Sequence, residues 1–101
     1  MRTLMKISIP VESGNKAIQD GSLPRVVQQT LESLRPEAAY FTADSDGKRH
    51  ALIVFDLKDS SDIPVIAEPL FIAFGAQVTM TPVMSAQDLQ AGLTKFAAAG
   101  R

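Results

Sequence analysis

Residues 38–57 read AAYFTADSDGKRHALIVFDL, two apolar runs on either side of a polar segment. The polar segment contains Asp46-Gly47, a dipeptide that is a strong signal for a tight turn between antiparallel strands. The two runs are rich in aromatic and β-branched residues, which are common in strands. The stretch therefore predicts a β-hairpin with strands over residues 38–43 and 49–57.

This hairpin is apolar on both faces. A turn of two or four residues would place Phe41, His50 and Leu52 on one face and Tyr40 and Ile53 on the other. An antiparallel sheet with one face in water alternates apolar and polar residues instead. We therefore expect both faces of the sheet to be covered.

Two further segments alternate between apolar and polar residues, which predicts strands. One covers residues 3–9 and is ended by Pro10, and the other covers residues 77–84 and contains Pro82. Because a proline cannot donate a hydrogen bond to a neighbouring strand, we expect the second of these strands at an edge of the sheet.

Apolar residues repeat at helical spacing in residues 22–35, 63–74 and 85–96. Before the first of these helices, residues 12–21 predict no more than one helical turn. Pro69 lies inside the second helix, where it removes a hydrogen bond, so we expect a kink or two short pieces there.

The predicted elements follow the order β-α-β-β-α-β-α in a single domain, residues 1–101. The first six match the ferredoxin-like α+β pattern, βαββαβ, and the seventh is an extra C-terminal helix. Right-handed crossovers place two helices on one face of a four-stranded antiparallel sheet, with strand order 4-1-3-2. For the other face we expect a second copy of the chain, sheet against sheet; alternatively, the C-terminal helix folds across it. Residues 59–94 contain no Lys or Arg, which fits an association surface.

Composition argues against several functions. Ten Lys and Arg stand against eleven Asp and Glu, for a net charge of -1, so nucleic-acid binding through bulk charge is not expected. The chain has no Cys and one His, so we expect no metal and no other cofactor. No apolar run is long enough for a signal sequence or a membrane span, which favours a cytoplasmic protein without a membrane partner.

Three stretches carry a resemblance to a known superfamily: NKAIQDGSLP at residues 15–24, RPEAAYF at 35–41 and AEPLF at 67–71. With the order of elements, they make the chain resemble the dimeric α+β barrel superfamily, and within it small bacterial proteins to which no activity is assigned. The resemblance spans nearly the whole chain and implies a ferredoxin-like subunit that dimerises by packing sheets. Members of the superfamily include cofactor-free monooxygenases, lactone isomerases and haem-degrading enzymes, so the resemblance selects no reaction.

Two side chains are candidates for catalytic proton transfer. His50 is the only histidine, and histidine is the side chain that titrates near neutral pH, so it could serve as a general base at the mouth of a cleft. Its alternative role is an exposed residue beside the turn. Lys6 is expected on the sheet face that the helices leave open, where it could bind an anion or transfer a proton; alternatively it reaches out to the rim.

Five residues are candidates for ligand binding. Tyr40 and Arg49 are predicted on the same hairpin face, where they could orient a small molecule. Glu68 precedes the proline that disturbs its helix, and Asn15 lies in the expected strand-to-helix loop. Thr79 is expected beside the lysine of the first strand. Each has a structural alternative, such as a strand core, a solvated helix surface or a loop cap.

The sequence therefore favours a small homodimer that binds a small organic molecule, either between sheet and helices or at the dimer interface. Two alternatives stay open. One is a cofactor-independent oxygenase or isomerase that acts on an activated carbon acid, with His50 or Lys6 as base. The other is a regulatory or structural subunit that docks a protein partner through its apolar sheet face.

Overall fold

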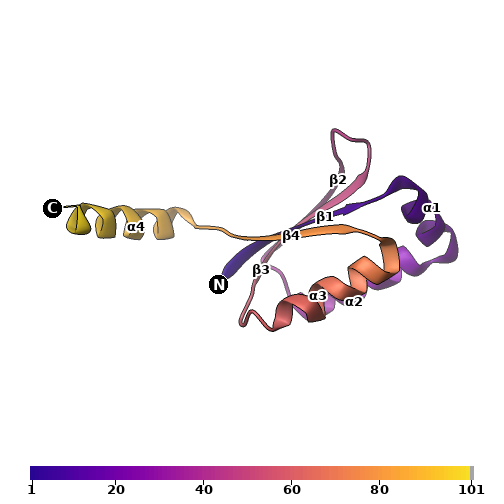
Figure 1. Cartoon of the computed structure of the whole chain (residues 1–101), viewed down its shortest axis with the longest axis horizontal. Helices are drawn as coiled ribbons and strands as arrows, with labels where there is room; N and C mark the ends of the chain where they lie inside the picture. The colour runs from indigo at the N-terminus through magenta and orange to yellow at the C-terminus, as the bar shows by residue number, and fades with distance from the viewer. Residues whose placement is uncertain (101) are drawn as a thin grey trace.

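A computed structural model describes residues 1–100 of the chain. It contains one four-stranded antiparallel sheet and four helices (Figure 1). The elements are β1 (Arg2–Ile9), α1 (Val11–Asp20), α2 (Ser22–Leu34), β2 (Ala38–Ala43), β3 (Arg49–Asp56), α3 (Asp62–Phe74), β4 (Gln77–Pro82) and α4 (Ala86–Ala99).

The order of strands in the sheet is β2-β3-β1-β4, which confirms the predicted 4-1-3-2 order and the ferredoxin-like α+β class. All three strand pairs are antiparallel. β4 ends with Pro82 and lies at an edge, where the missing amide hydrogen costs the sheet nothing. α2 and α3 lie on the same side of the sheet in Figure 1, as right-handed crossovers require. We call the opposite side the open face.

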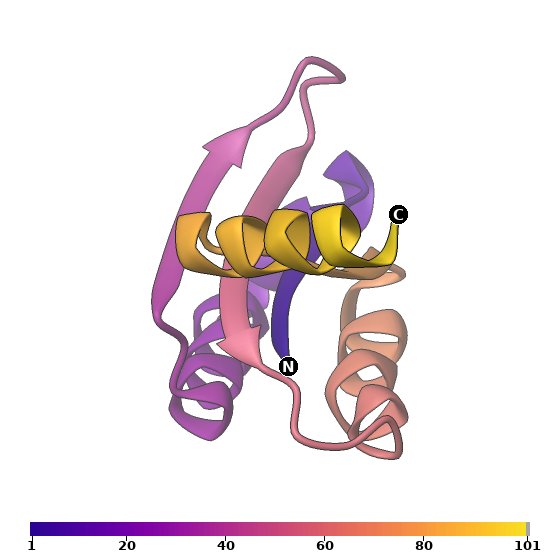
Figure 2. The same cartoon turned by 90° about the vertical axis from the view of Figure 1, so that its left-hand side faces the viewer.

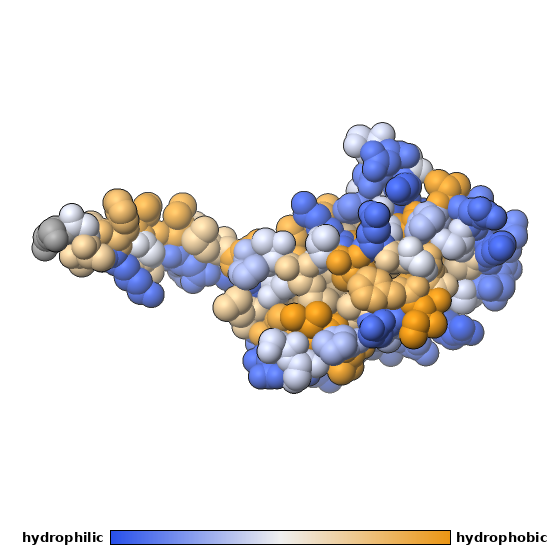
Figure 3. All heavy atoms as spheres, viewed as in Figure 1, coloured by the Kyte–Doolittle hydropathy of each residue, from blue (hydrophilic) through white to orange (hydrophobic). Residues whose placement is uncertain are grey.

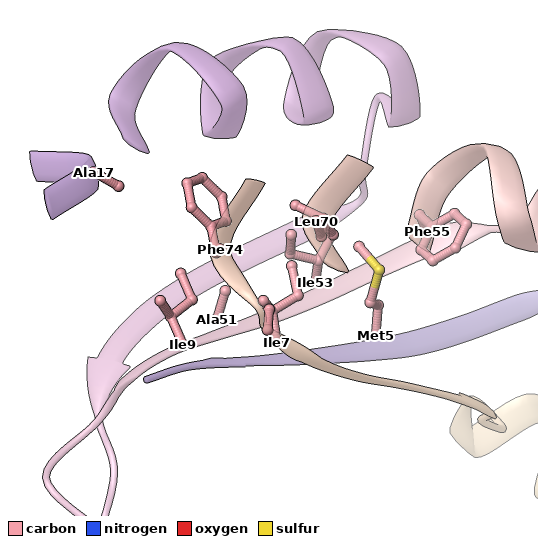
Figure 4. Packing of buried hydrophobic residues seen from close by; sticks show 10 residues of the cluster. Met5, Ile7, Ile9, Ala17, Ala51, Ile53, Phe55, Leu70 and Phe74 are labelled. Carbon is pink, nitrogen blue, oxygen red and sulfur yellow. The ribbon is translucent and has the colours of Figure 1, made fainter. Parts of the chain in front are cut away.

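Alternate residues of the two central strands form the core. Met5, Ile7 and Ile9 of β1 face the helices, as do the buried residues of β3, and Figure 4 shows them beneath α3. From α3, Leu70 and Phe74 pack onto them and are 2% and 1% exposed. Full burial of one such side chain stabilises the fold by roughly 1.5–3 kcal/mol, so this layer is the main source of stability.

The hairpin register differs from the expected one. Ala43 pairs with Arg49, so the connection comprises residues 44–48, an odd number, and Tyr40 pairs with Leu52. The loop closes through an amide of Asp44 that donates to Lys48 O at 3.0 Å. The prediction that Tyr40 and Arg49 share a face is therefore wrong. A five-residue connection moves every β2 side chain to the face opposite the one predicted.

Two helical predictions also need correction. Residues 12–21 form most of α1, a ten-residue helix, where one turn was expected; Gly21 then adopts φ 80° and separates α1 from α2. α3 runs unbroken through Pro69, so the two-piece alternative is wrong. Pro69 is exposed, and the carbonyl that lacks a donor can be hydrated there.

α4 projects from the domain beyond the end of the sheet in Figure 1 and lies in front of the strands in Figure 2, and the molecule has a long axis of 59 Å. Ser85 and Asp88 form a reciprocal capping box at its start, with bonds of 3.0 and 3.1 Å. Its apolar residues remain exposed: Phe96, for example, is 73% exposed. The alternative in which this helix folds across its own sheet is not what the structure shows.

The proline inside α3 provides a test of the helix. We expect Pro69→Ala to raise the free energy of unfolding by roughly 1–3 kcal/mol, because it restores an amide donor and removes a clash with the preceding turn. Urea denaturation measures this change. Pro64→Ala is the matched control: Pro64 is also exposed but lies in the first turn, where its amide would have no helical acceptor, so we expect little change. Equal effects of the two substitutions would contradict the argument.

Candidate functional site

A cavity of about 370 Å³ lies between the helix-covered face of the sheet and α2, near the β2–β3 turn. Pockets for small molecules typically have volumes of about 300–1,000 Å³ and apolar walls. Strands and helices both contribute side chains to the wall of this cavity. Figure 4 shows several of these side chains from close by. The lining residues are Ile7, Ile9, Leu23, Val27, Thr30, Phe41, Thr42, Arg49, His50, Ala51, Ile53, Leu70 and Phe74.

The cavity lies beneath α2, which packs less closely on the sheet than α3 does. α3 has three buried residues, whereas α2 has none, and its apolar residues Leu23 and Val27 stay half-buried. On the opposite wall Ala51 is small, and Phe41 remains 55% exposed on β2. Apolar surface that the core does not use is therefore available to a bound molecule.

One cationic side chain lies on this wall. Arg49 is half-buried, and its Nη2 donates to Asn15 Oδ1 at 3.2 Å. Within residues 1–100 Arg49 forms no ion pair, and no carboxylate lines the cavity. The cavity therefore combines an apolar wall with one guanidinium group.

The first turns of α1 contain three poor helix formers, and each makes a tertiary contact. Ser13 Oγ donates to Phe74 O at 2.7 Å, and Asn15 accepts from Arg49. Gly14 is buried, and a Cβ there would lie 2.6 Å from Arg49 Nη1. Glycine inside a helix costs about 1 kcal/mol relative to alanine, and this position uses it to admit the guanidinium. Asn15 thus lies in a helix rather than in the expected loop.

His50 pairs with a residue that the sequence analysis missed. Its Nδ1 lies 2.8 Å from Asp44 Oδ2, and the two side chains are 18% and 23% exposed. The register pairs His50 with Ser8, so its side chain belongs to the open face, although His50 also borders the cavity. Counting the connection as five residues would have revealed Asp44 as its neighbour across the turn.

The same carboxylate holds the turn together. Asp44 Oδ1 accepts from the amides of Asp46 at 3.0 Å and Lys48 at 3.3 Å. Partial desolvation raises the pKa of Asp44, but hydrogen bonds from the Lys48 amide, the His50 ring and the Asp46 amide outweigh it and lower the pKa below its ordinary value of 3.8. Asp44 is therefore ionised at neutral pH.

The other candidate residues lie away from the cavity. Lys6 is exposed on the open face, between Leu52 and Thr79 in the register, as expected. Tyr40 is 67% exposed on the same face. Glu68 is exposed on α3 and does not line the cavity. Of the predicted residues, Arg49 and His50 line the cavity, and Asn15 accepts a hydrogen bond from Arg49 without lining it.

Residues 1–100 contain no group of three or more His, Cys, Asp or Glu side chains that could hold a metal ion. Among the same residues, no helix has the length and apolar character that crossing a membrane requires.

Comparison with models of known protein families gives no match, and neither does comparison with curated proteins. Among solved structures, the fold is similar to a crystal structure of a formyltetrahydrofolate deformylase from Pseudomonas putida KT2440, with a TM-score of 0.52 and 18% identity. The similarity covers 82% of this chain and 29% of the deformylase chain. At this identity the similarity supports the fold alone, a small α+β domain with a four-stranded antiparallel sheet.

The depressed pKa of Asp44 predicts how stability depends on pH. A carboxyl that binds protons less readily in the folded state stabilises the fold above its unfolded pKa, and this contribution is lost as the pH falls through the folded pKa. We therefore expect Asp44→Asn to lower the free energy of unfolding at pH 7. Between about pH 5 and pH 3, the free energy of unfolding of this variant should fall less steeply than that of the wild type. Urea denaturation at several pH values measures both effects.

Asp46→Asn is the control for this experiment, since the Asp46 carboxylate accepts no hydrogen bond within the part of the chain that the structure describes. A pH profile for Asp44→Asn as steep as that of the wild type would contradict the role given to Asp44.

Proposed function

We propose that this protein binds a small organic molecule in the cavity between α2 and the sheet. The supporting observation is the cavity itself: a volume of about 370 Å³, walls of Ile, Leu, Val and Phe side chains, and few polar groups to orient a ligand. The cavity lies between sheet and helices, the first of the two locations that the sequence favoured.

A probe that fits the cavity tests this proposal. We expect naphthalene-2-carboxamide, a neutral and largely apolar molecule, to bind the wild-type protein in a fluorescence titration. Val27→Trp should weaken binding at least about tenfold, because a larger side chain on the half-buried lining face of α2 fills the cavity.

Gln28→Trp is the matched control, since Gln28 is exposed on the same helix and does not line the cavity. Absence of binding to the wild type, or equal weakening by both tryptophan variants, would overturn the proposal. Native mass spectrometry of freshly purified protein adds an independent readout, because a retained adduct gives the mass of the natural ligand.

We also propose that the chain forms a homodimer, with the open sheet face packed against a second copy as in a dimeric α+β barrel. On the open face, Leu4, Leu52 and Val54 are only half-buried, and Tyr40 is largely exposed. Figure 3 shows apolar residues gathered along the upper side of the projecting α4, while α2 and α3 lie below the sheet in the same view. A second copy can cover both surfaces at once.

A charged residue among the exposed apolar residues of α4, namely Leu89, Leu93 and Phe96, tests the dimer. Leu93 is 58% exposed, so Leu93→Glu should leave the fold intact but place a charge in the interface. We expect a wild-type dimer and a Leu93→Glu monomer in light scattering after size exclusion. Ala91→Glu, on the opposite side of the same helix, should remain dimeric.

A wild-type monomer would overturn the dimer. The exposed apolar surfaces would then favour the alternative of a subunit that docks a different protein.

The Asp44–His50 pair supports a second candidate function, a cofactor-independent oxygenase or isomerase. A carboxylate on Nδ1 orients an imidazole and leaves Nε2 to act as a base. This candidate ranks second because the register assigns the His50 side chain to the open face, whereas the apolar cavity lies on the other. Turnover of a bound carbon acid to product would distinguish the enzyme from a binding protein.

A further inference from the structure

We propose that the molecule bound in the cavity is an apolar carboxylate with a single negative charge, and that Arg49 holds the carboxylate group. This inference rests on the proposed function and adds the chemical class of the ligand.

The charge balance of the cavity supports an anion. Among residues 1–100, Arg49 is the only Lys or Arg on the cavity wall, and no Asp or Glu of this range lines it. A guanidinium has five N–H donors, and the structure gives Arg49 one side-chain acceptor, the neutral Asn15 Oδ1 at 3.2 Å. Arg49 as a whole is half-buried beside apolar groups, its bond to Asn15 is exposed, and an anionic partner that accepts its remaining hydrogen bonds would stabilise the guanidinium.

Asp44 and Glu12, which lie on segments adjoining Arg49 or Asn15 in the sequence, do not supply this partner. Asp44 already accepts hydrogen bonds from two backbone amides and faces the His50 ring. Glu12 lies in the first turn of α1, is exposed, and forms no ion pair with Arg49. A ligand can therefore provide the missing charge.

Two residues of α1, Gly14 and Asn15, determine where the Arg49 guanidinium lies. Gly14 is buried in the helix, and any side chain there would collide with Arg49 Nη1, since a Cβ would lie only 2.6 Å away. One residue later, Asn15 Oδ1 accepts from Nη2. A planar guanidinium held on one side in this way keeps donors free for a carboxylate, which it binds through two parallel hydrogen bonds.

The rest of the wall limits the ligand to one charge and an apolar body. A dianion such as a phosphate monoester would need more than one cationic partner, and an amine would be repelled by Arg49. The lining also includes Leu23, Val27 and Phe41, which favour a hydrocarbon or aromatic group.

A pair of probes of equal shape tests this inference. We expect the wild-type protein to bind naphthalene-2-carboxylate at least about tenfold more tightly than naphthalene-2-carboxamide at pH 7, because only the carboxylate forms charge-assisted hydrogen bonds. Arg49→Met keeps an apolar stem and removes the charge, so it should abolish the preference for the acid while the amide still binds.

Gly14→Ala is a second variant that leaves Arg49 in place. Alanine favours the helix, so the fold should persist, but its Cβ displaces the guanidinium and should also reduce the preference. Equal affinities of acid and amide for the wild type, or an unchanged preference in Arg49→Met, would overturn the carboxylate and leave the proposed cavity function intact. Failure of both probes to bind the wild type would overturn both.

Discussion

The hydrogen bonds that Asp44 accepts determine which side chains reach each face of the hairpin. Its carboxylate binds the amides of Asp46 and Lys48 and faces the His50 ring, and these contacts close a connection of five residues. Because side chains alternate along a strand, a connection one residue shorter or longer would exchange the two faces of β2. Phe41 would then leave the cavity wall, and Tyr40 would take its place. The composition of the cavity thus depends on a turn that lies outside its apolar interior.

The two helices that cover the sheet differ in how closely they pack on it. α3 contributes the fully buried Leu70 and Phe74 to the core. α2 contributes only half-buried residues, so a cavity remains beneath it. Protein interiors normally fill such space, because each unfilled volume loses dispersion contacts. A cavity that the core leaves unfilled beside Arg49 is therefore the observation on which the proposed ligand site depends.

Hydrophobic periodicity predicted most of the fold. It identified four strands and the helices that became α2, α3 and α4, since each carries a regular apolar stripe or face, and the order of elements then gave the order of strands. It failed at α1, because Ser13, Gly14 and Asn15 are poor helix formers, and tertiary contacts to Phe74 and Arg49 support the helix there. Arg49, a candidate from the sequence, lies on the cavity wall, but the aromatic residue on its face is Phe41 and not Tyr40, since the number of residues in the turn was not evident. Asp44 was missed for the same reason.

The cavity and α4 lie at opposite ends of the sheet. The proposed ligand and the proposed second subunit would therefore contact different parts of the molecule. The cavity wall includes Ile7 and Ile9 at the end of β1, whereas α4 follows Pro82, which pairs with Thr3 near the start of that strand. Apart from Thr42 and His50, the residues of the cavity wall do not belong to the open face. A second copy on α4 and the open face would therefore cover little of the cavity wall. Binding of a ligand and pairing of subunits then depend on different residues, so a substitution in one surface perturbs the other only through the shared strands.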